Sequence, residues 1–447
     1  MRQAAKFLLP LYLVMCLVLG GSNHGIWQSA VLQGIAALLI GLVVVAAPTE
    51  RLPRPSRLLL GIVLAAVLLV ALQLMPLAPE LWTKLPGRAP IKDGYDALGL
   101  ALPWLPLSLT PHGSMDAVFF GLPFLAVVLG ILLVQQADPR WFVAALLLGT
   151  IANVALGAVQ AAGGEEWKIY SITNTGAVGF FANRNFLGTL LVVNIPFAVA
   201  LMGSGNQASR HAGLTFRVVG AAYLLVILIG IVLNRSLAAG LIALPVFGAN
   251  FALLRSKLSW KYYATAMAVL LAGAAVVLLA SGQLRSESVG SDTVSVQTRV
   301  AIWSQTLKIV GDTFPFGTGL GSFREIYAFH ENPALIDRFY VNNAHNDYLE
   351  FVLETGLAGI LLICGLFAWW FVQTKQIWSS VNPDLLPRAA TIASAAILAH
   401  SIVDYPLRTA AISAVLAFCL GVMATSGRSS ARTVHPSQRN TRHVRIA

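Results

Sequence analysis

Runs of eighteen or more apolar residues recur along the whole of this 447-residue chain, and they constrain its fold more than any other feature. A helix of that length is long enough to cross a hydrocarbon layer of ~30 Å. Lipid offers no hydrogen-bond partner to an open backbone, and the runs lack the period-two alternation of barrel strands. Because 57% of the residues are also hydrophobic, the sequence predicts an all-α polytopic membrane protein.

We predict about twelve transmembrane helices. The first follows the basic Arg2 and Lys6, as the apolar part of a signal peptide would, but no small-residue cleavage site follows it convincingly, so we interpret it as a helix. The twelve predicted spans are residues 7–21, 26–47, 58–76, 117–135, 141–162, 185–203, 216–233, 237–254, 263–281, 356–374, 389–403 and 409–426.

Four regions follow from these spans. Residues 1–281 hold the first nine helices and an external loop at 77–116, and residues 282–355 form a long loop that is too polar to cross a bilayer. Residues 356–426 hold the last three helices. Residues 427–447 are rich in Arg, Ser, Thr and Pro, which predicts a basic disordered tail that is attracted to anionic lipid rather than to nucleic acid.

The distribution of charge predicts the orientation. If the N-terminus is cytoplasmic, the inner segments hold 18 Lys and Arg against 3 acidic residues, a net charge of +15, while the outer segments have a net charge of −4. Because Lys and Arg are retained on the cytoplasmic side, both termini are predicted to be cytoplasmic. The remaining external loops are then 163–184, 234–236 and 404–408.

The unusual polar clusters all fall in these external loops. Residues 179–185 lead into a predicted helix, where Asn183, Arg184 and Asn185 are candidates for binding a polar headgroup; the alternative is that Asn185 only caps the helix. Arg235 lies at a corner between two helices with almost no loop. It either snorkels to the interface or faces inward, where its guanidinium matches phosphate oxygens.

A second outer arginine, Arg299, opens an amphipathic stretch. Val300, Trp303, Leu307 and Val310 recur at helical spacing, which predicts a helix lying on the membrane surface. The turn at 315–321 follows, and its three alternating glycines are typical of a phosphate-binding loop, although alone they are weak evidence.

The densest polar cluster, residues 342–350, reads Asn-Asn-Ala-His-Asn-Asp-Tyr-Leu-Glu. A histidine at a membrane surface can exchange a proton near neutral pH, which makes His345 the best candidate for acid–base chemistry, against the alternative of a structural interfacial histidine. The spacing from His345 to Leu349 and Val352 predicts that the motif opens a helix with these side chains on one face. Its polar neighbours with predicted substrate contacts are Asn343, Asp347 and Glu350.

Other chemistries fit the sequence poorly. Its His, Asp and Glu residues lack the spacing of a metal site, and no Walker loop, dinucleotide fingerprint or nucleophile elbow follows a predicted strand. Charges are also rare at the centres of the predicted helices, which argues against an ion-coupled transporter. The sequence therefore predicts chemistry at the outer face, without a metal or a cofactor.

In the order and spacing of these motifs, the chain resembles the O-antigen ligase and polymerase superfamily of bacterial inner-membrane glycosyltransferases. The resemblance rests on residues 179–185, 234–236, 299–303, 315–321, 345–356 and 400–407. It implies a glycosyltransferase C-like fold and a metal-independent, inverting transfer of a glycan from undecaprenyl diphosphate at the periplasmic face. It also assigns the essential histidine to His345 and the two phosphate-binding arginines to Arg235 and Arg299.

The resemblance leaves the acceptor open. Ligases use lipid A core, polymerases use the growing polysaccharide, and related enzymes use protein hydroxyls; we favour the ligase activity, with other polysaccharide assembly proteins as further candidate partners. Two alternatives come from other classes. A lipid-linked glycan flippase would need cations along a central cavity, and a structural partner in an export assembly would not need His345.

Overall fold

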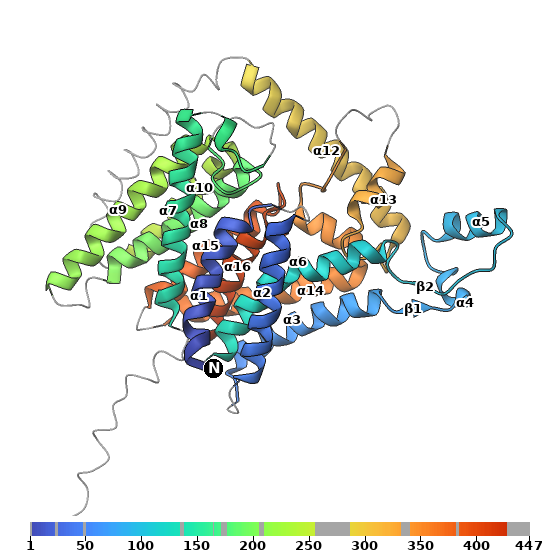
Figure 1. The fold of residues 1–447 in the computed structure, drawn as a ribbon, viewed down its shortest axis with the longest axis horizontal. Helices are drawn as coiled ribbons and strands as arrows, with labels where there is room; N and C mark the ends of the chain where they lie inside the picture. Colours follow the sequence, from blue (N-terminus) through green and yellow to red (C-terminus); the bar gives the residue numbers. More distant parts are fainter. Residues whose placement is uncertain are drawn as a thin grey trace, which may run out of the picture.

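The computed structural model describes residues 2–22, 26–47, 51–134, 138–163, 165–170, 177–204, 210–254, 287–331, 340–380 and 384–426. The chain is an all-α polytopic membrane protein, as its apolar runs predicted (Figure 1). Within the described residues, seven helices are long and apolar enough to cross a membrane. They are α2 (Trp27–Val45), α3 (Arg54–Gln73), α6 (Pro111–Leu133), α7 (Pro139–Gly163), α8 (Arg184–Ser204), α9 (Arg210–Asn234) and α14 (Asp347–Trp378).

Four shorter apolar helices accompany them: α1 (Arg2–Leu19), α10 (Leu237–Leu254), α15 (Leu385–His400) and α16 (Ala410–Thr425). Each predicted span coincides with one of these helices except the ninth, 263–281, which lies outside the described residues. The remaining elements are short or lie in the polar segments: β1 (Pro76–Leu77), α4 (Pro79–Trp82), α5 (Ala89–Ala97), β2 (Leu105–Pro106), η1 (Glu165–Trp167), α12 (Glu287–Thr313), α13 (Phe323–His330) and η3 (Pro406–Arg408).

The centre of the bundle is formed by α8 and α16, in which nearly every side chain is buried. Figure 1 shows α16 between α1, α6 and α15, and contacts with these three helices agree with the view. Small residues allow the close approach: α16 is rich in Ala, and Gly421 packs directly against Ile131 of α6. Close packing of small residues is the usual basis of helix association in lipid, because lipid tails remove the hydrophobic drive between helices.

The described parts of the loops that were predicted to be external lie at one end of the bundle, where hydrogen bonds join them. The Gln73 side chain, at the end of α3, donates to the Glu354 carbonyl at 2.9 Å and accepts from the Leu320 amide at 3.0 Å. Asn234, at the end of α9, donates to the carbonyls of Ala177 and Arg184. We call this the outer end; its placement in the periplasm stays a prediction.

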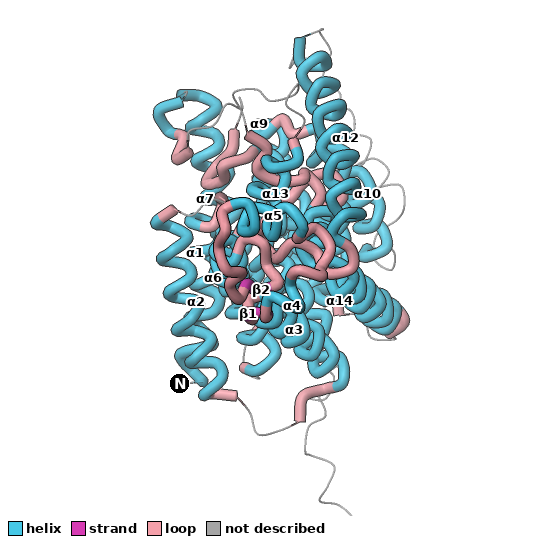
Figure 2. Tube along the Cα trace, turned by 90° about the vertical axis from the view of Figure 1, so that its right-hand side faces the viewer, coloured by secondary structure: helices cyan, strands magenta, loops and turns pink. Residues whose placement is uncertain are grey.

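An arm between α3 and α6 projects from the outer end (Figure 1). It contains α4, α5 and the antiparallel pair of β1 and β2, in which Pro76 lies opposite Pro106. Arg88 is buried in the arm and donates to the Pro106 and Leu107 carbonyls. Figure 2 views the molecule from the side of this arm and shows that β1 and β2 are the only strands in the part of the chain that is described.

The glycine turn at 315–321 is not an open phosphate-binding loop, contrary to the sequence-based expectation. The Thr318 amide donates to the Leu353 carbonyl at 3.0 Å, and the Gly319 amide donates to the Glu354 carbonyl at 2.8 Å. Gly319 adopts a φ of 103°, and a Cβ there would collide with Ser108. The glycines are therefore needed for close packing between the arm and α14, and these two amides are already used.

The helix predicted from Arg299 onward is present within α12, but α12 begins at Glu287, so Arg299 lies in the interior of the helix and not at its start. The exposed positions of Val300 and Leu307 match one side of the predicted face. The prediction missed the opposite, packed side. Ile302, Thr306 and Ile309 are buried there and face α13 and α14. Because Ile302, Thr306 and Ile309 follow one another at intervals of four and three residues, they share one face of α12, and this face packs against the outer part of α14.

The outer part of α14 precedes a kink at Gly356, where φ is 60° and ψ is −142°. The Leu357 amide donates to the Pro315 carbonyl at 2.8 Å across this kink. The helix itself begins at Asp347, because the Asn346 side chain caps it by accepting from the Leu349 amide at 3.0 Å. His345 therefore lies before the helix rather than on a helical face with Leu349, which corrects that detail of the sequence analysis.

Candidate active site

A chain of side-chain hydrogen bonds crosses the outer end of the bundle. The Ser236 hydroxyl donates to Asn185 Oδ1 at 2.8 Å, and Asn185 Nδ2 donates to Asp404 Oδ2 at 2.8 Å. These residues come from the α9–α10 corner, the start of α8 and the connection between α15 and α16. Three loops that are distant in sequence thus meet at the buried carboxylate of Asp404.

His345 lies directly beside this carboxylate. Its Nδ1 is 3.3 Å from Asp404 Oδ1, and its ring meets Tyr405 edge-on at a centroid distance of 4.9 Å. Nδ1 has no completed hydrogen bond within the described chain, so the pair is a close electrostatic contact that a small ring rotation would convert into a hydrogen bond. With Nδ1 directed at Asp404, Nε2 is the nitrogen available to a substrate.

Arg299, from α12, completes the group. Its Nη2 is 3.8 Å from Asp404 Oδ2, and its side chain is 23% exposed. Its Nε is buried and has no hydrogen-bond partner among the described residues. A buried donor without a partner costs free energy, and a hydrogen bond to an anionic group would remove that cost. Arg299 is therefore able to donate a further hydrogen bond to such a group.

Asp404 is held in its charged form. Burial alone would raise its pKa, but the adjacent His345 ring, together with the charges of Arg299 and His400, lowers the pKa of the Asp404 carboxyl to about 2. The Tyr405 amide and the Asn185 side chain also donate to it. The site therefore contains a permanent carboxylate that stabilises a positive charge on the neighbouring imidazole.

Backbone strain marks two of the predicted catalytic residues. Among the described residues, only Arg235 and His345 have a positive φ without being glycine, with values of 55° and 51°. A non-glycine residue in this region costs about 1–3 kcal/mol and persists only where the surroundings impose it. The hydrogen bonds of Asn234 and Ser236 hold the backbone on both sides of Arg235, whose own side chain is exposed.

A second cluster of polar side chains, centred on Arg408, lies next to the His345 loop. Arg408 Nη2 lies 2.9 Å from Glu354 Oε2 and 3.3 Å from Glu350 Oε1, and Arg408 Nε lies 3.9 Å from Asp347 Oδ1. All three carboxylates are buried. Burial lowers the pKa of the Arg408 guanidinium, but Glu350, Glu354 and Asp347 outweigh it and raise that pKa above its usual range.

This carboxylate cluster is connected to the backbone next to His345. Glu350 accepts from Asn343 Nδ2 at 2.9 Å and from the Ala344 amide at 2.7 Å. The Trp303 indole donates to the Ala344 carbonyl at 2.8 Å. The conformation of the loop is thus fixed by contacts with both α14 and α12.

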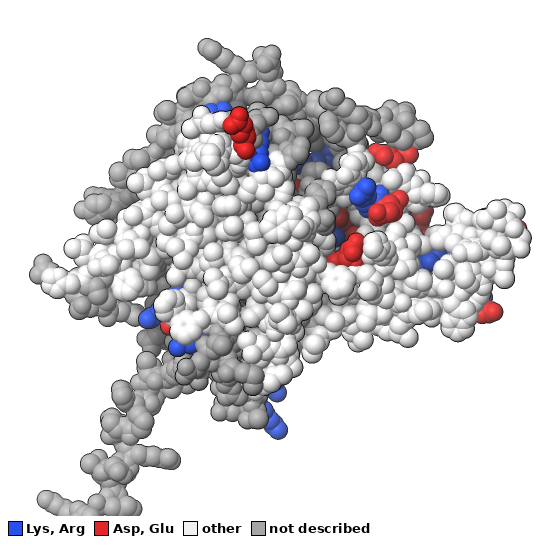
Figure 3. All heavy atoms as spheres, in the orientation of Figure 1, with Lys and Arg blue, Asp and Glu red and all other residues white. Residues whose placement is uncertain are grey.

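The charged groups lie where the helices end. In Figure 3 the visible face of the bundle is almost free of charge. Lys and Arg occur along its lower edge and also in the upper part, where most of the visible Asp and Glu lie around the outer segments. The buried Asp, Glu, His and Arg side chains of the described chain, from Arg88 to Asp404, likewise belong to the outer end.

Residues 221–364 match the family model described as O-antigen ligase. This segment is similar to the O-antigen ligase family. The match agrees with the superfamily that the sequence motifs predicted and supports a glycosyltransferase-like enzyme domain, while the seven apolar helices support a multi-pass membrane protein. Among curated proteins, no match to the chain was found.

The matched segment contains Arg235, Arg299 and His345, but not all of the site. Asn185 precedes it, and Asp404 and Arg408 follow it. From sequence, residues 400–407 were noted only as a motif, and neither Asp404 nor Arg408 was predicted as a site residue. A sequence signal existed: Asp404 and Arg408 are two charges in a short loop between apolar helices.

The other predicted site residues lie around this centre. Asn183 accepts from the Asn185 amide at 2.9 Å, which places it, and not Asn185, as the cap of α8. Arg184 is half-buried at the start of that helix. Asn343, Asp347 and Glu350 face the Arg408 cluster, so the structure places them behind the His345 loop.

Proposed function

We propose that this protein transfers a glycan from undecaprenyl diphosphate to a hydroxyl of lipid A core, at the periplasmic face of the bacterial inner membrane. The observation that carries the proposal is the convergence of His345, Asp404 and Arg299 at one end of an apolar bundle. A base, a group that orients it and a cation for a leaving group are the parts that such a transfer requires.

In the proposed reaction, the acceptor hydroxyl attacks the anomeric carbon and the bond from that carbon to the diphosphate oxygen breaks. His345 Nε2 accepts the hydroxyl proton, and the Asp404 carboxylate stabilises the imidazolium that forms. A single displacement of this kind inverts the anomeric configuration.

Arginines would stabilise the negative charge that grows on the departing diphosphate. Arg299 has a buried Nε without a partner in the described structure, and the exposed Arg235 lies at the corner that is linked through Ser236 and Asn185 to Asp404. Fixed cations aimed at developing charge give the largest catalytic effect in many enzymes. This role requires no metal ion.

A flippase fits the described residues less well. It would need charged or polar groups along a path through the bundle. The buried carboxylates of the described chain instead gather at the outer end, and α8 and α16 contain no charged side chain beyond Arg184 at the outer start of α8.

The test is transfer by purified protein in lipid nanodiscs, with a lipid-linked glycan as donor and lipid A core as acceptor. We expect a glycan–core product, and a loss on the order of 10²-fold or more in His345→Ala, whose insertion should stay normal because His345 is partly exposed. Elongated lipid-linked glycan without core product would identify a polymerase instead. Undiminished transfer by His345→Ala would refute the mechanism.

A further inference from the structure

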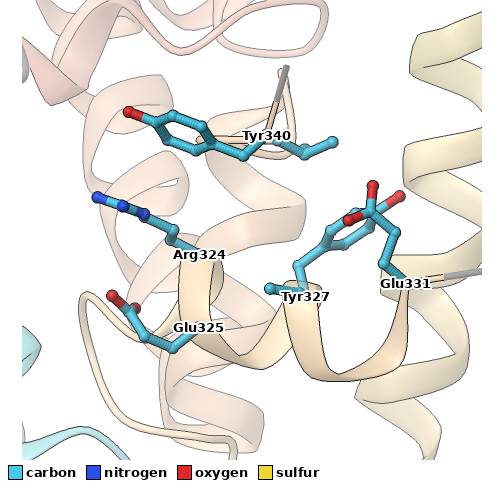
Figure 4. Close-up of a pocket in the computed structure, with 7 residues that line it drawn as sticks. Arg324, Glu325, Tyr327, Glu331 and Tyr340 are labelled. Atoms are coloured by element: carbon cyan, nitrogen blue, oxygen red, sulfur yellow. The ribbon is translucent and has the colours of Figure 1, made fainter. Parts of the chain in front are cut away.

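A pocket of about 260 Å³ opens beside α13, outside the group around His345 (Figure 4). Its walls are formed by Arg324, Glu325, Tyr327, Glu331 and Tyr340. This volume is small for a drug-sized ligand and suits a small polar group such as one sugar ring. The pocket combines aromatic rings with charged side chains, and neither the fold nor the proposed reaction explains that combination.

Tyr340 supplies a flat, accessible surface. Its ring is 59% exposed, and the Arg324 guanidinium lies 4.6 Å from the ring centre. Figure 4 shows Arg324 and the Tyr340 ring one above the other. Stacking on a cation holds an exposed ring in place at little entropic cost. A fixed aromatic face of this kind is suited to the apolar C–H face of a sugar ring.

The polar groups supply the other half of sugar recognition. Glu325 and Glu331 are hydrogen-bond acceptors, whereas the free edges of Arg324 are donors, so together they match hydroxyl groups that both donate and accept. Among the described lining residues, two carboxylates and one guanidinium give a net charge of −1. A neutral or amino sugar is therefore favoured over an acidic sugar.

The floor of the pocket is connected to the His345 loop. Tyr327 is buried and stacks on Phe323 at a centroid distance of 5.3 Å, and both pack in one small core with Ala344. Val341 lines the pocket and is four residues from His345, so the chain bounds their separation at roughly 14 Å. A short oligosaccharide could therefore occupy the pocket and reach His345.

We propose that this pocket binds a neutral or amino sugar residue of a glycan substrate, at a distance of a few sugar units from the transfer site. This inference rests on the proposed function. The sugar could belong to the acceptor or to the donor, since both present the same ring and hydroxyl chemistry.

The test compares Tyr340→Ala with Phe329→Ala, which removes another exposed aromatic ring, 72% exposed against 59% for Tyr340, from α13 outside the pocket. Steady-state transfer is measured with acceptor varied and then with donor varied. We expect Tyr340→Ala to raise KM roughly tenfold for one of the two substrates, with kcat nearly unchanged, because an aromatic contact contributes about one factor of ten in affinity. The substrate whose KM rises identifies the source of the sugar.

A binding measurement separates this inference from the proposed function. Soluble core oligosaccharide and the deacylated donor glycan are titrated by calorimetry into His345→Ala and into its double variant with Tyr340→Ala. Weaker binding in the double variant supports the pocket even if wild-type protein shows no transfer. Equal binding of both glycans, or unchanged KM values beside normal wild-type transfer, overturns it.

Discussion

At the scale of single residues, strain and unused hydrogen-bonding capacity occur together. Arg235 and His345 keep an unfavourable backbone conformation, and Arg299 keeps a buried Nε without a partner in the described chain. Selection for stability alone would replace the first two by glycine. The presence of Arg235 and His345 at these positions is consistent with residues that are retained for a functional role and not for stability.

Replacing Arg235 by glycine should therefore stabilise the protein while impairing it. Arg235→Gly and Arg235→Ala both remove the guanidinium, but only glycine relieves the positive φ, so we expect Arg235→Gly to be about 1 kcal/mol more stable than Arg235→Ala. Both should bind lipid-linked donor more weakly than wild type. Thermal unfolding in detergent and donor titration check the two effects; equal stability of the variants would contradict the strain.

Asp404 should make stability depend on pH in the acidic range. Its folded pKa of about 2 lies below the model-compound value of 3.8, so its carboxylate stabilises the folded state above pH 4, by about 2 kcal/mol, and this contribution is lost as pH falls through 2. Asp404→Asn lacks this dependence. Unfolding of wild type and variant from pH 5 to pH 2 is the measurement; parallel curves would show that Asp404 is not held as a carboxylate.

At the scale of elements, the short connection between α15 and α16 does two things at once. Asp404 faces His345 and Arg299, and Arg408, in η3, faces the carboxylates on the outer part of α14. A shift of this connection would therefore move the base and its supporting loop together.

Arg408→Gln should be strongly destabilising. It leaves Asp347, Glu350 and Glu354 buried without their cation, and breaking such a cluster costs about 3–5 kcal/mol. Adding Glu354→Gln should restore part of the stability, because one uncompensated carboxylate is removed. Lys92→Gln is the control: its ion pair with Asp96 is exposed to solvent, so its loss should change the stability little. An Arg408→Gln effect as small as the control would exclude the cluster as a stabilising unit.

Elements were easier to predict than the contacts between them. Hydropathy located the membrane helices because lipid imposes the same requirement on every span. The packed face of α12 was missed since Ile302 and Ile309 are buried against segments that hydropathy does not pair. The glycines of 315–321 were misinterpreted because close packing and anion binding demand the same residue.

The candidate site shows the same division. Density of polar residues singled out His345. Arg235 and Arg299 were noted as arginines on the outer side, and their phosphate-binding role came from the family resemblance. Asp404 and Arg408 were missed as site residues because their partners lie some 54 to 219 positions away in sequence, and a single chain gives no sign of such pairs. The partners of a buried charge are set by the tertiary fold.

At the scale of the whole molecule, we expect transfer to survive chelation. Arginines take the charge-neutralising role in the proposed reaction, and the outer carboxylates of α14 are already paired with Arg408. The measurement is transfer in nanodiscs after treatment with EDTA. Activity that disappears and returns with one added divalent metal would require a metal-dependent mechanism.

The position of α16 has a consequence for synthesis. This helix follows all of the other described helices in the chain, yet it lies in the middle of the bundle and nearly all of it is buried (Figure 1). Helices that emerge earlier must therefore leave room for it, and Asp404 and Arg408, which precede it, can be fixed only once it has entered. A nascent chain in the membrane thus lacks an assembled site until its translation has passed α16.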